Sequence, residues 1–410
     1  MRYVLIILVQ MLLWHTLCGI SGAETPDSWQ PQETLEAFVR ITWRRGPDLP
    51  QGFQDSDGGF LGNWLITAGG FCSGIESDNL RKPGRYPRGF LNRVWGLDTS
   101  RQDAMWQELP PLPGEPRQGL FSAVIDDAMY FWGGFNYTDP CTYADGHRLT
   151  GSPGHWQWSR LPDLPYRLCA AAMCVAGKRI YLVGGADYDG KTGFFTASDR
   201  DGQHRRLGAR LWTFNTVKPA DGWVELASLP GTPRFVHAAV AVGDRIYVIG
   251  GATGDLVQNG RSYGYCTVVD NWMYDTAAGT WSRLRDLPIS SGNFPKSSNL
   301  VFLNRYILLP GGHQYAWVAN PDGTIRPRYG VASSFRRESG LHNDFFVYDT
   351  HTGLFGTGDK LPIDNNLPMT VVRGNEIFLL GGETGGGEID GVWYGHHPDL
   401  LLIGQVTVAR

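Results

Sequence analysis

Short apolar runs that end in a Gly-Gly doublet recur along the chain. Two of them are near copies, "RIYLVGG" at 179–185 and "RIYVIGG" at 245–251. A strand that is copied indicates a repeated unit rather than a single core. The six doublets end "LITAGG" at Gly70, "MYFWGG" at Gly134, "IYLVGG" at Gly185, "IYVIGG" at Gly251, "YILLPGG" at Gly312 and "IFLLGG" at Gly382.

Two further signatures accompany most doublets. The first is an aromatic strand that ends in Asp-Thr or a variant of it: "VWGLDT" (94–99), "LWTFNT" (211–216), "NWMYDT" (271–276), "FFVYDT" (345–350) and "VWYGHH" (392–397). The second is a Trp or another bulky residue that runs into Leu-Pro: "MWQELPPLP" (105–113), "WQWSRLPDLP" (156–165), "GWVELASLP" (222–230), "TWSRLRDLP" (280–288) and "GLFGTGDKLP" (353–362). Each repeat therefore predicts four short strands in one sheet. One such sheet cannot bury both of its faces, but sheets arrayed around an axis bury each other.

The doublet, the aromatic strand and the Trp strand together resemble the Kelch repeat, over about residues 38–397. The resemblance implies an all-β fold, a six-bladed Kelch-type β-propeller with four antiparallel strands per blade. The fold alone does not define a function, because Kelch propellers serve both as enzymes and as binding platforms.

One copy of the repeat is out of order. "ITWRRGPDLP" (41–50) is a fourth-strand signature with no first three strands before it, and no such signature follows "VWYGHH". The sequence therefore predicts that the N-terminal strand completes the sixth blade and closes the ring. "LLLIGQVTVAR" (400–410) is then a short C-terminal tail, and residues 24–410 form a single domain.

The N-terminus predicts export. A short basic start precedes the apolar segment 3–17, and "SGA" (21–23) is a small-x-small cleavage pattern, so residues 1–23 are predicted to be a signal peptide. The alternative is a membrane anchor, but fifteen residues are fewer than the roughly 20 that a spanning helix needs. The mature protein is expected to be secreted or periplasmic, with no membrane association after cleavage.

Composition excludes several classes of function. The formal net charge of −4 gives no support for nucleic-acid binding. No Gly-rich loop precedes a helix and no metal-ligand spacing is present, so neither a cofactor nor a metal is expected. Five cysteines follow the predicted signal peptide: Cys72, Cys141, Cys169, Cys174 and Cys266. Cys72 and Cys141 follow the doublets of neighbouring blades by two and seven residues, so both are expected on the same face, which predicts a disulfide between them.

A cation stands shortly after Leu-Pro in four successive repeats, where the inner strand of the next blade begins. These cations are Arg117, Arg167, Arg234 and Lys296. Inner strands line the central channel, so the four are predicted to converge and bind an anionic ligand. The alternative is that they are structural residues of the Kelch repeat, bonded to the backbone of neighbouring blades. The long basic loops after the doublets also favour an anionic ligand.

Candidate acid–base groups directly follow the doublets. They are Asp187 in "GGAD", His313 and Tyr315 in "GGHQY", and Glu383 in "GGETGGG". Glu383 is the strongest candidate for a general base, because three glycines (385–387) leave space around it. The alternative for Glu383 is an ion pair with one of the ring arginines.

Among Kelch proteins, the chain is similar to the sialic acid mutarotase (N-acetylneuraminate epimerase) group. The resemblance implies an isomerase that opens and recloses a carboxylated sugar ring with a loop Glu and an Arg a few residues later. Glu383 matches the Glu, but the only Arg after it is Arg410. Glu338 in "RRESGLHND" is the alternative, with His342 after it. Two functions stay open: an enzyme on an anionic sugar, as mutarotase or lyase, and a propeller that binds an acidic glycan or protein without chemistry.

Overall fold

The computed structural model describes residues 35–76, 79–83, 86–191, 193–254, 256–296, 299–330 and 340–409, and only the backbone of 75–76 and 79–83. The predicted signal peptide and Glu338 lie outside these residues. None of the helices in this described part has the length and the apolar character that crossing a bilayer requires.

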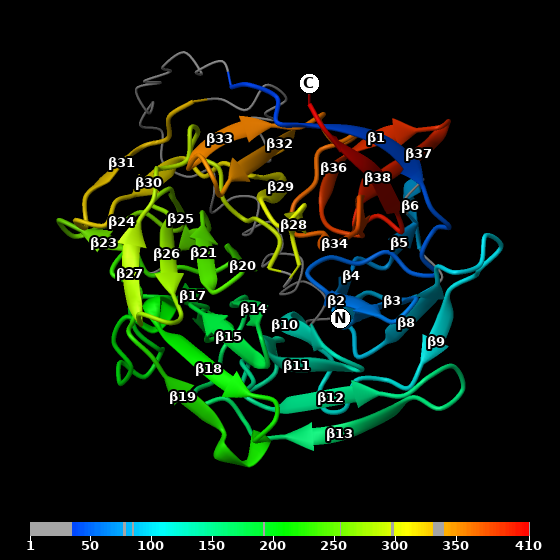
Figure 1. Ribbon diagram of the computed structural model, residues 1–410, viewed down its shortest axis with the longest axis horizontal. Helices are drawn as coiled ribbons and strands as arrows, with labels where there is room; N and C mark the ends of the chain where they lie inside the picture. The colour runs from blue at the N-terminus through cyan, green and yellow to red at the C-terminus, as the bar shows by residue number, and fades with distance from the viewer. Residues whose placement is uncertain are drawn as a thin grey trace, which may run out of the picture.

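Six sheets of four antiparallel strands make up the body of the described structure and are arranged around a central axis (Figure 1). Sheet 1 contains β2 (Asp57–Leu61), β3 (Trp64–Ala68), β8 (Val94–Asp98) and β9 (Gln107–Leu109). Sheet 2 contains β10 (Gln118–Ile125), β11 (Ala128–Phe135), β12 (Gly146–Thr150) and β13 (Gln157–Leu161). Sheet 3 contains β14 (Ala172–Ala176), β15 (Arg179–Val183), β18 (Leu211–Asn215) and β19 (Trp223–Glu225).

The remaining three sheets continue the series. Sheet 4 contains β20 (Ala238–Val242), β21 (Arg245–Ile249), β26 (Trp272–Asp275) and β27 (Thr280–Arg283). Sheet 5 contains β28 (Val301–Phe302), β29 (Tyr306–His313), β32 (Leu341–Asp349) and β33 (Leu354–Thr357). Sheet 6 contains β34 (Met369–Arg373), β35 (Glu376–Leu380), β38 (Leu401–Val408) and β1 (Val39–Arg45). The all-β prediction is confirmed.

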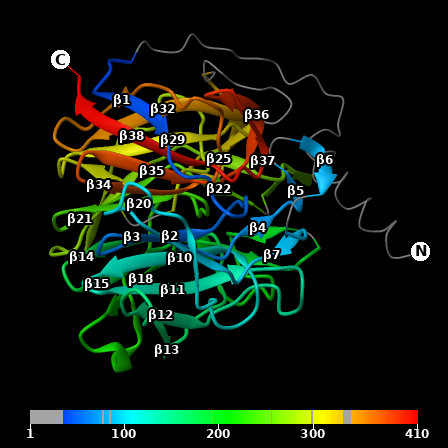
Figure 2. The same cartoon turned by 90° about the vertical axis from the view of Figure 1, so that its right-hand side faces the viewer.

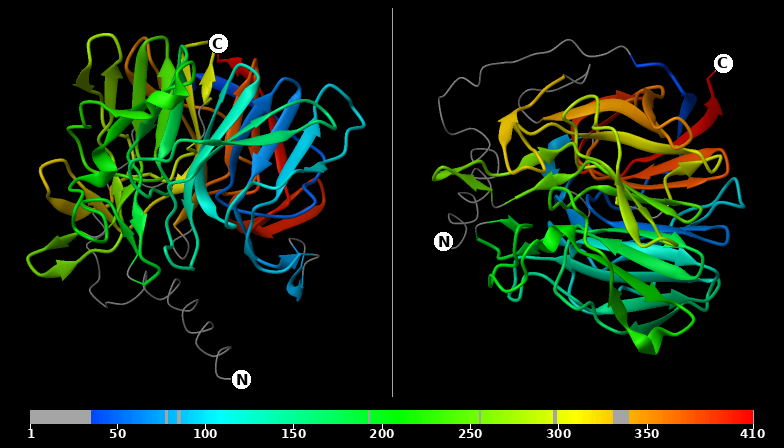
Figure 3. Two further views of the ribbon diagram at one scale, coloured as in Figure 1. Left: turned by 90° about the horizontal axis from the view of Figure 1, so that it is seen from below. Right: turned by 60° about the vertical axis from the view of Figure 1, so that its left-hand side comes forward.

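Short strands in the loops after the second strands form small additional sheets. They are β4 (Phe71–Cys72), β5 (Ile75–Glu76), β6 (Asn79–Pro83), β7 (Gly89–Phe90), β16 (Asp187–Tyr188), β17 (Phe194–Phe195), β22 (Ala252–Thr253), β23 (Val257–Gln258), β24 (Arg261–Ser262), β25 (Cys266–Val268), β30 (Trp317–Ala319), β31 (Ile325–Pro327), β36 (Thr384–Ile389) and β37 (Val392–His396). Two 3-10 turns, η1 (Leu207–Ala209) and η2 (Pro219–Asp221), complete the described elements. Figure 2 shows β5–β6 and β36–β37 on one side of the molecule, and Figure 3 shows the β23–β24 hairpin extending toward the same side.

The core lies between the sheets. Each pair of neighbouring sheets shares one cluster of buried apolar side chains, for example Leu120 of sheet 2 against Ile66 of sheet 1. Sheets 6 and 1 share such a cluster as well, in which Phe378 and Leu401 pack with Leu65 and Trp95. Burial of both faces explains why the inner strands are nearly continuous apolar runs rather than alternating ones.

At the Gly-Gly doublets the backbones of neighbouring sheets come close enough to form hydrogen bonds. Both glycines of each doublet have positive φ, and the second donates its N–H to a carbonyl of the next sheet's leading segment in five of the six cases, as Gly185 does to Arg234 at 2.9 Å. A Cβ on Gly184 would lie 2.6 Å from that same carbonyl oxygen. The prediction that the doublets permit close backbone approach is confirmed.

The N-terminal strand pairs where the sequence predicts. β1 is antiparallel to β38 from the Val39–Val408 pair to the Arg45–Leu402 pair. Trp43 donates its indole N–H to the carbonyl of Lys360 in the preceding sheet at 2.8 Å. Outer-strand tryptophans elsewhere make the same contact, as Trp281 does to Ala227 at 2.7 Å. β1 is therefore the outer strand of sheet 6.

The C-terminal strand corrects the sequence prediction. β38 lies between β35 and β1, so it is the third strand of sheet 6 and not a tail. "VWYGHH", which the repeat pattern aligns with third strands, forms β37 in a separate hairpin with β36. The β36–β37 hairpin is inserted before the third strand, which therefore begins about ten residues later than the repeat spacing predicts. For this reason the sequence pattern assigned "VWYGHH" to the third strand.

Candidate functional site

One face of the molecule gathers the candidate residues. In antiparallel sheets the loops after the second strand and the segments that lead into the first strand lie at the same end. Each doublet is followed by a residue that pairs with such a leading segment. The pairs are Phe71 with Gln54, Phe135 with Gln118, Ala186 with Cys169, Ala252 with Phe235, His313 with Gly292 and Glu383 with Asn366. We call this end the loop face.

These six pairs place His313 and Glu383 at equivalent positions of sheets 5 and 6. Four of the six positions after a doublet are apolar, and the two ionisable ones are neighbours. The Gly312 N–H donates to the carbonyl of Asn365 at 3.0 Å, and Asn366 exchanges backbone hydrogen bonds with Glu383 at 2.8 and 2.9 Å. The backbone therefore fixes one residue relative to the other.

The Glu383 carboxylate is half-buried and held by an amide. Asn366 Nδ2 donates to Glu383 Oε2 at 3.3 Å. Gly385 and Gly386 follow in β36, and Gly385 is exposed. A carboxylate that is oriented but partly accessible is suited to proton transfer with a bound molecule.

His313 and Tyr315 form one unit on the neighbouring sheet. Their rings lie 4.2 Å apart between centroids. Asn293 Nδ2 donates to the Tyr315 hydroxyl oxygen at 3.1 Å. Sequence analysis missed Asn293 and Asn366, because an Asn in a leading segment resembles an ordinary turn residue.

Two of the four cations that were predicted to converge on the channel form ion pairs with carboxylates of this chain. Arg117 donates to Asp145 Oδ2 at 3.1 Å and is 2% exposed. Arg234 is fully buried and donates to Asp270 Oδ2 at 2.6 Å and to the Gly250 carbonyl at 3.1 Å. Neither guanidinium is accessible to a ligand, so the structural alternative describes these two residues. The neighbouring guanidinium helps to hold the pKa of the Asp270 carboxyl below its usual value despite burial.

The other two cations differ from each other. Lys296 is buried and forms an ion pair with Asp55. Burial raises the pKa of the nearby Asp57 carboxyl to about 6, although Lys296 lowers it in part. Arg167 is accessible, since 40% of its side chain is exposed, and its nearest carboxylate is that of Asp201 at 3.9 Å. Only Arg167 of the four is thus free enough to meet a ligand.

Asp187 and His342 are buried structural residues in this arrangement. Asp187 accepts hydrogen bonds from the backbone N–H of Tyr188 at 2.9 Å and of Arg200 at 3.2 Å. His342 has no exposed surface and its Nε2 lies 2.7 Å from Ser291 Oγ. Burial lowers the pKa of His342 to about 4. His342 is thus enclosed completely and Asp187 is 4% exposed, so protein groups surround both side chains.

Arg88 is an accessible cation on the loop face. Its guanidinium lies over the ring of Phe71 at 5.0 Å, and Phe71 directly follows the doublet of sheet 1. Arg88 forms no ion pair with any carboxylate whose side chain the structure describes. Sequence analysis noted the basic loop that contains Arg88 but not this residue, because the contact of Arg88 with Phe71 depends on how the loop folds.

Aromatic rings form a continuous arc over the same face. Successive ring contacts with centroid distances of 5.0–6.2 Å join Phe71, Phe90, Phe135, Phe194, Phe235, Tyr265 and Tyr315. These rings come from sheets 1 to 5. The arc thus runs along the loop face from sheet 1 to Tyr315, beside the ionisable residue His313 of sheet 5.

The predicted disulfide is absent. All five cysteines in the described part of the chain are free and buried. Cys72 packs between sheets 6 and 1, whereas Cys141 packs in the aromatic cluster with Phe135 and Tyr188. Both cysteines follow a doublet, Cys72 by two residues and Cys141 by seven, but they lie in different clusters. Among the described residues, no group of three or more His, Cys, Asp or Glu side chains could hold a metal ion.

Comparisons with known proteins identify the repeat and a set of relatives. A Kelch motif matches residues 233–288. N-acetylneuraminate epimerase of Haemophilus influenzae (strain 86-028NP) is 24% identical over 83% of this chain and 88% of its own length. The protein of that name from Pasteurella multocida is also 24% identical, over 83% and 89%.

More distant matches agree on the fold. Kelch domain-containing protein 3 of Homo sapiens is 24% identical over 56% of each chain. A solved structure described as "Structure of YjhT" superposes with a TM-score of 0.59 at 16% identity, over 89% of this chain and 99% of that one. The chain thus carries a Kelch motif and is similar along most of its length to proteins named N-acetylneuraminate epimerase.

Proposed function

We propose that this protein interconverts the anomers of a carboxylated sugar of the N-acetylneuraminate type at the loop face. One observation carries the proposal: within a chain similar to named epimerases, the two ionisable residues that follow doublets, His313 and Glu383, stand on neighbouring sheets. An acid and a base at fixed separation are what ring opening of a sugar requires.

The reaction needs only proton transfers. In the proposed first step Glu383 removes the proton of the anomeric hydroxyl, and the His313–Tyr315 pair donates a proton to the ring oxygen. The bond between the anomeric carbon and the ring oxygen breaks, which leaves an open-chain ketone. Rotation presents the other face of the carbonyl, and the same groups run the transfers in reverse. One proton is removed and one is added, so no oxidant or cofactor takes part.

Arg88 is the proposed partner of the sugar carboxylate, with Arg167 as a second cation. Arg88 is exposed, stacks on Phe71 and forms no ion pair with any carboxylate whose side chain the structure describes. A guanidinium binds a carboxylate through two parallel hydrogen bonds. The aromatic arc would contact the C–H faces of the sugar and its acetyl methyl, opposite the acid–base pair.

Anomer exchange measured by NMR on N-acetylneuraminate tests this proposal. The wild-type protein should accelerate exchange, and Glu383→Gln should lower the rate by about 10²- to 10⁴-fold, which is the usual contribution of general acid–base catalysis. Glu388→Gln, an exposed residue of the same β36–β37 hairpin, is the matched control and should keep the wild-type rate. Binding without any acceleration by the wild type would favour the alternative, a propeller that binds acidic ligands without chemistry.

We further propose that residues 24–410 form one complete six-bladed ring and that the protein is exported after cleavage at Ala23. The pairing of β1 with β38 and the apolar cluster shared by sheets 6 and 1 support closure. Gly382 N–H also donates to the carbonyl of Phe53, at 2.8 Å, as other doublets do to the next sheet. The intact mass of the protein isolated from a secreting host checks the cleavage site.

A further inference from the structure

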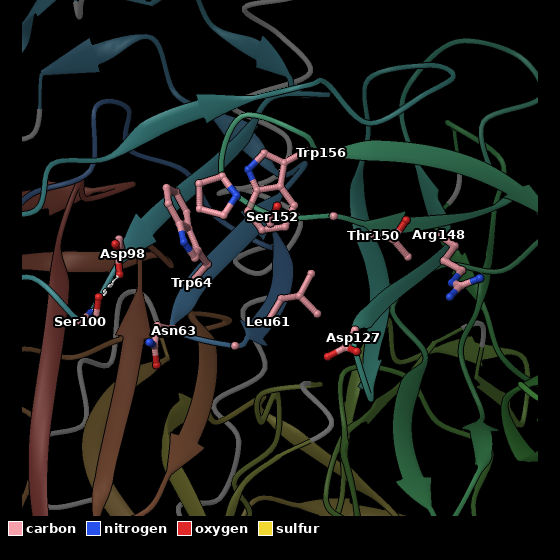
Figure 4. A pocket seen from close by; sticks show the side chains of 13 residues that line it. Leu61, Asn63, Trp64, Asp98, Ser100, Asp127, Arg148, Thr150, Ser152 and Trp156 are labelled. Atoms are coloured by element: carbon pink, nitrogen blue, oxygen red, sulfur yellow. Dashed lines mark hydrogen bonds between the residues drawn. The ribbon is translucent and has the colours of Figure 1, made fainter.

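A pocket of about 730 Å³ lies at the end of the sheets opposite the loop face. Its walls come from the turns between the first and second strands and between the third and fourth strands of sheets 1 and 2. In antiparallel sheets these turns stand at the other end from the Gly-Gly doublets. Figure 4 shows Trp64 and Trp156 side by side at the centre of this pocket, with Asp127 and Arg148 across from them.

Trp64 is not a residue that the repeat requires. It stands five positions before the first glycine of its doublet, at the start of β3. The equivalent residues of the other sheets are Ala128, Arg179, Arg245, Tyr306 and Glu376, and the two arginines are exposed. Among these positions only Tyr306 is also a large aromatic residue, and it packs in the cluster between sheets 5 and 6.

Trp156 is a second departure from the repeat. The repeat tryptophan of sheet 2 is Trp158, which donates its indole N–H to the carbonyl of Pro110 at 2.9 Å. Trp156 precedes it by two residues, where sheet 4 has Gly279 before Trp281. Its role is therefore not the contact between outer strands that Trp158 and Trp281 make.

The two additional tryptophans meet across neighbouring sheets. Their rings are 5.6 Å apart between centroids and inclined at 66°. Neither indole N–H donates to an acceptor among the described residues. Neither indole nitrogen belongs to the buried polar atoms that lack a hydrogen-bond partner, so both retain some contact with solvent. The indole N–H groups of Trp64 and Trp156 are therefore two accessible hydrogen-bond donors at the bottom of the pocket, although the two side chains are only 7% and 9% exposed.

Polar groups of both kinds surround this floor. Asp127 and Arg148 are exposed on sheet 2, and Asn63 is exposed on sheet 1. Asp98 adds a second carboxylate, which accepts a hydrogen bond from Ser100 at 2.6 Å. Two carboxylates and one guanidinium leave the pocket with a negative balance. That balance disfavours the anionic sugar proposed for the loop face, since like charges repel.

We propose that this pocket binds a neutral saccharide of about two sugar units, as a site separate from the loop face. A pocket of this volume lies in the range that holds a small ligand. Sugar hydroxyls both donate and accept hydrogen bonds, which matches indole and guanidinium donors beside carboxylate and amide acceptors. Aromatic edges and faces suit the C–H surface of a pyranose ring.

Saturation-transfer NMR with three neutral disaccharides, N,N′-diacetylchitobiose, lactose and maltose, tests the proposal. At least one should bind the full-length wild-type protein. Asp127→Ala, at an exposed position, should weaken that binding at least 5-fold, and Trp156→Ala should weaken it at least 10-fold. Trp393→Ala is the control, because Trp393 is 45% exposed on the β36–β37 hairpin and far along the chain from the pocket. It should bind the disaccharide like the wild type.

N-acetylneuraminate binding provides the second control. The Asp127 and Trp156 variants should keep it, so a failed loop-face proposal and a failed pocket proposal give different results. The pocket proposal is overturned if none of the three disaccharides binds at a concentration of about 5 mM, since a dissociation constant weaker than that corresponds to a binding free energy of only about −3 kcal/mol. It is also overturned if binding persists in Asp127→Ala and Trp156→Ala, or if Trp393→Ala abolishes it.

Discussion

Lys296 and Asp55 form a buried ion pair between sheets 5 and 1, although 241 residues separate them in sequence. Sheet 6 lies between these two sheets around the axis, so the pair links segments that are not neighbours. The side chains are 4% and 7% exposed. The ion pair thus joins two leading segments of the loop face directly, in addition to the apolar clusters between adjacent sheets.

Removal of the lysine charge should be costly. In Lys296→Met the Asp55 carboxylate stays buried without its cation, and breaking a buried ion pair costs about 3–5 kcal/mol of unfolding free energy. The double variant Lys296→Met/Asp55→Asn should be more stable than the single one, because the unpaired charge is gone. Asn also tolerates the φ of 53° at position 55. Urea unfolding measures both, and equal stabilities of the single and double variants would contradict this assignment.

Deletion of residues 38–50 should abolish cooperative unfolding. It removes β1 together with Ile41, exposes the edge of β38 and uncovers Leu402, which packs with Ile41 in the cluster shared by sheets 5 and 6. An exposed strand edge beside apolar surface favours aggregation. Thermal unfolding followed by circular dichroism, together with size-exclusion chromatography, checks this. A truncated protein that melts like its parent would show that β1 is dispensable.

The repeat signatures predicted most of the fold because each one has a local physical cause. Both glycines of each doublet, such as Gly184 and Gly185, adopt positive φ where the backbone approaches the next sheet, so the doublets show in the sequence where neighbouring sheets meet. The order of the last strands was not predictable in the same way, since β38 carries none of the signatures and is defined only by its pairing with β35 and β1.

The candidate site was predictable in place but not in detail. Positions after the doublets indicated His313 and Glu383 because the repeat fixes where those residues lie. The accessibility of each cation depends instead on carboxylates from other parts of the chain. Asp145 forms an ion pair with Arg117 and Asp270 forms one with Arg234, and the spacing of these residues in the sequence does not reveal either pair.

Replacement of Arg234 should lower the stability of the protein, whereas replacement of Arg88 should lower its affinity for N-acetylneuraminate. Arg234→Ala leaves Asp270 buried without its partner and should lower the unfolding free energy by about 3–5 kcal/mol. Arg88→Ala should change stability by less than about 1 kcal/mol, since Arg88 is exposed. It should weaken the binding of N-acetylneuraminate by about 10- to 150-fold, equivalent to the 1.5–3 kcal/mol of a hydrogen bond to a charged group. Isothermal titration and thermal melts of both variants give the comparison. Unchanged affinity in Arg88→Ala would remove Arg88 from the proposed site.

Acidification should destabilise the protein partly through His342. Its pKa is about 4 in the folded protein because it is buried, against 6.5 for an unperturbed histidine. Between these values the unfolded chain binds a proton that the folded protein does not, so the contribution of His342 is complete above pH 6.5 and decreases as the pH falls toward 4. Asp57 acts in the opposite direction, since its raised pKa of about 6 makes the folded protein bind the additional proton below that pH.

A comparison of variants isolates the histidine from the aspartate. Gln can keep a hydrogen bond to Ser291 without titrating, so His342→Gln should lose less stability than the wild type between pH 7.5 and pH 5, by about 2 kcal/mol. His155→Gln, at an exposed position, is the matched control and should follow the wild type. Urea unfolding at each pH measures the difference. If His342→Gln and the wild type lose stability in parallel, the His342 imidazole is protonated in the folded protein at the same pH as in the unfolded chain, and its burial has no part in the response to acid.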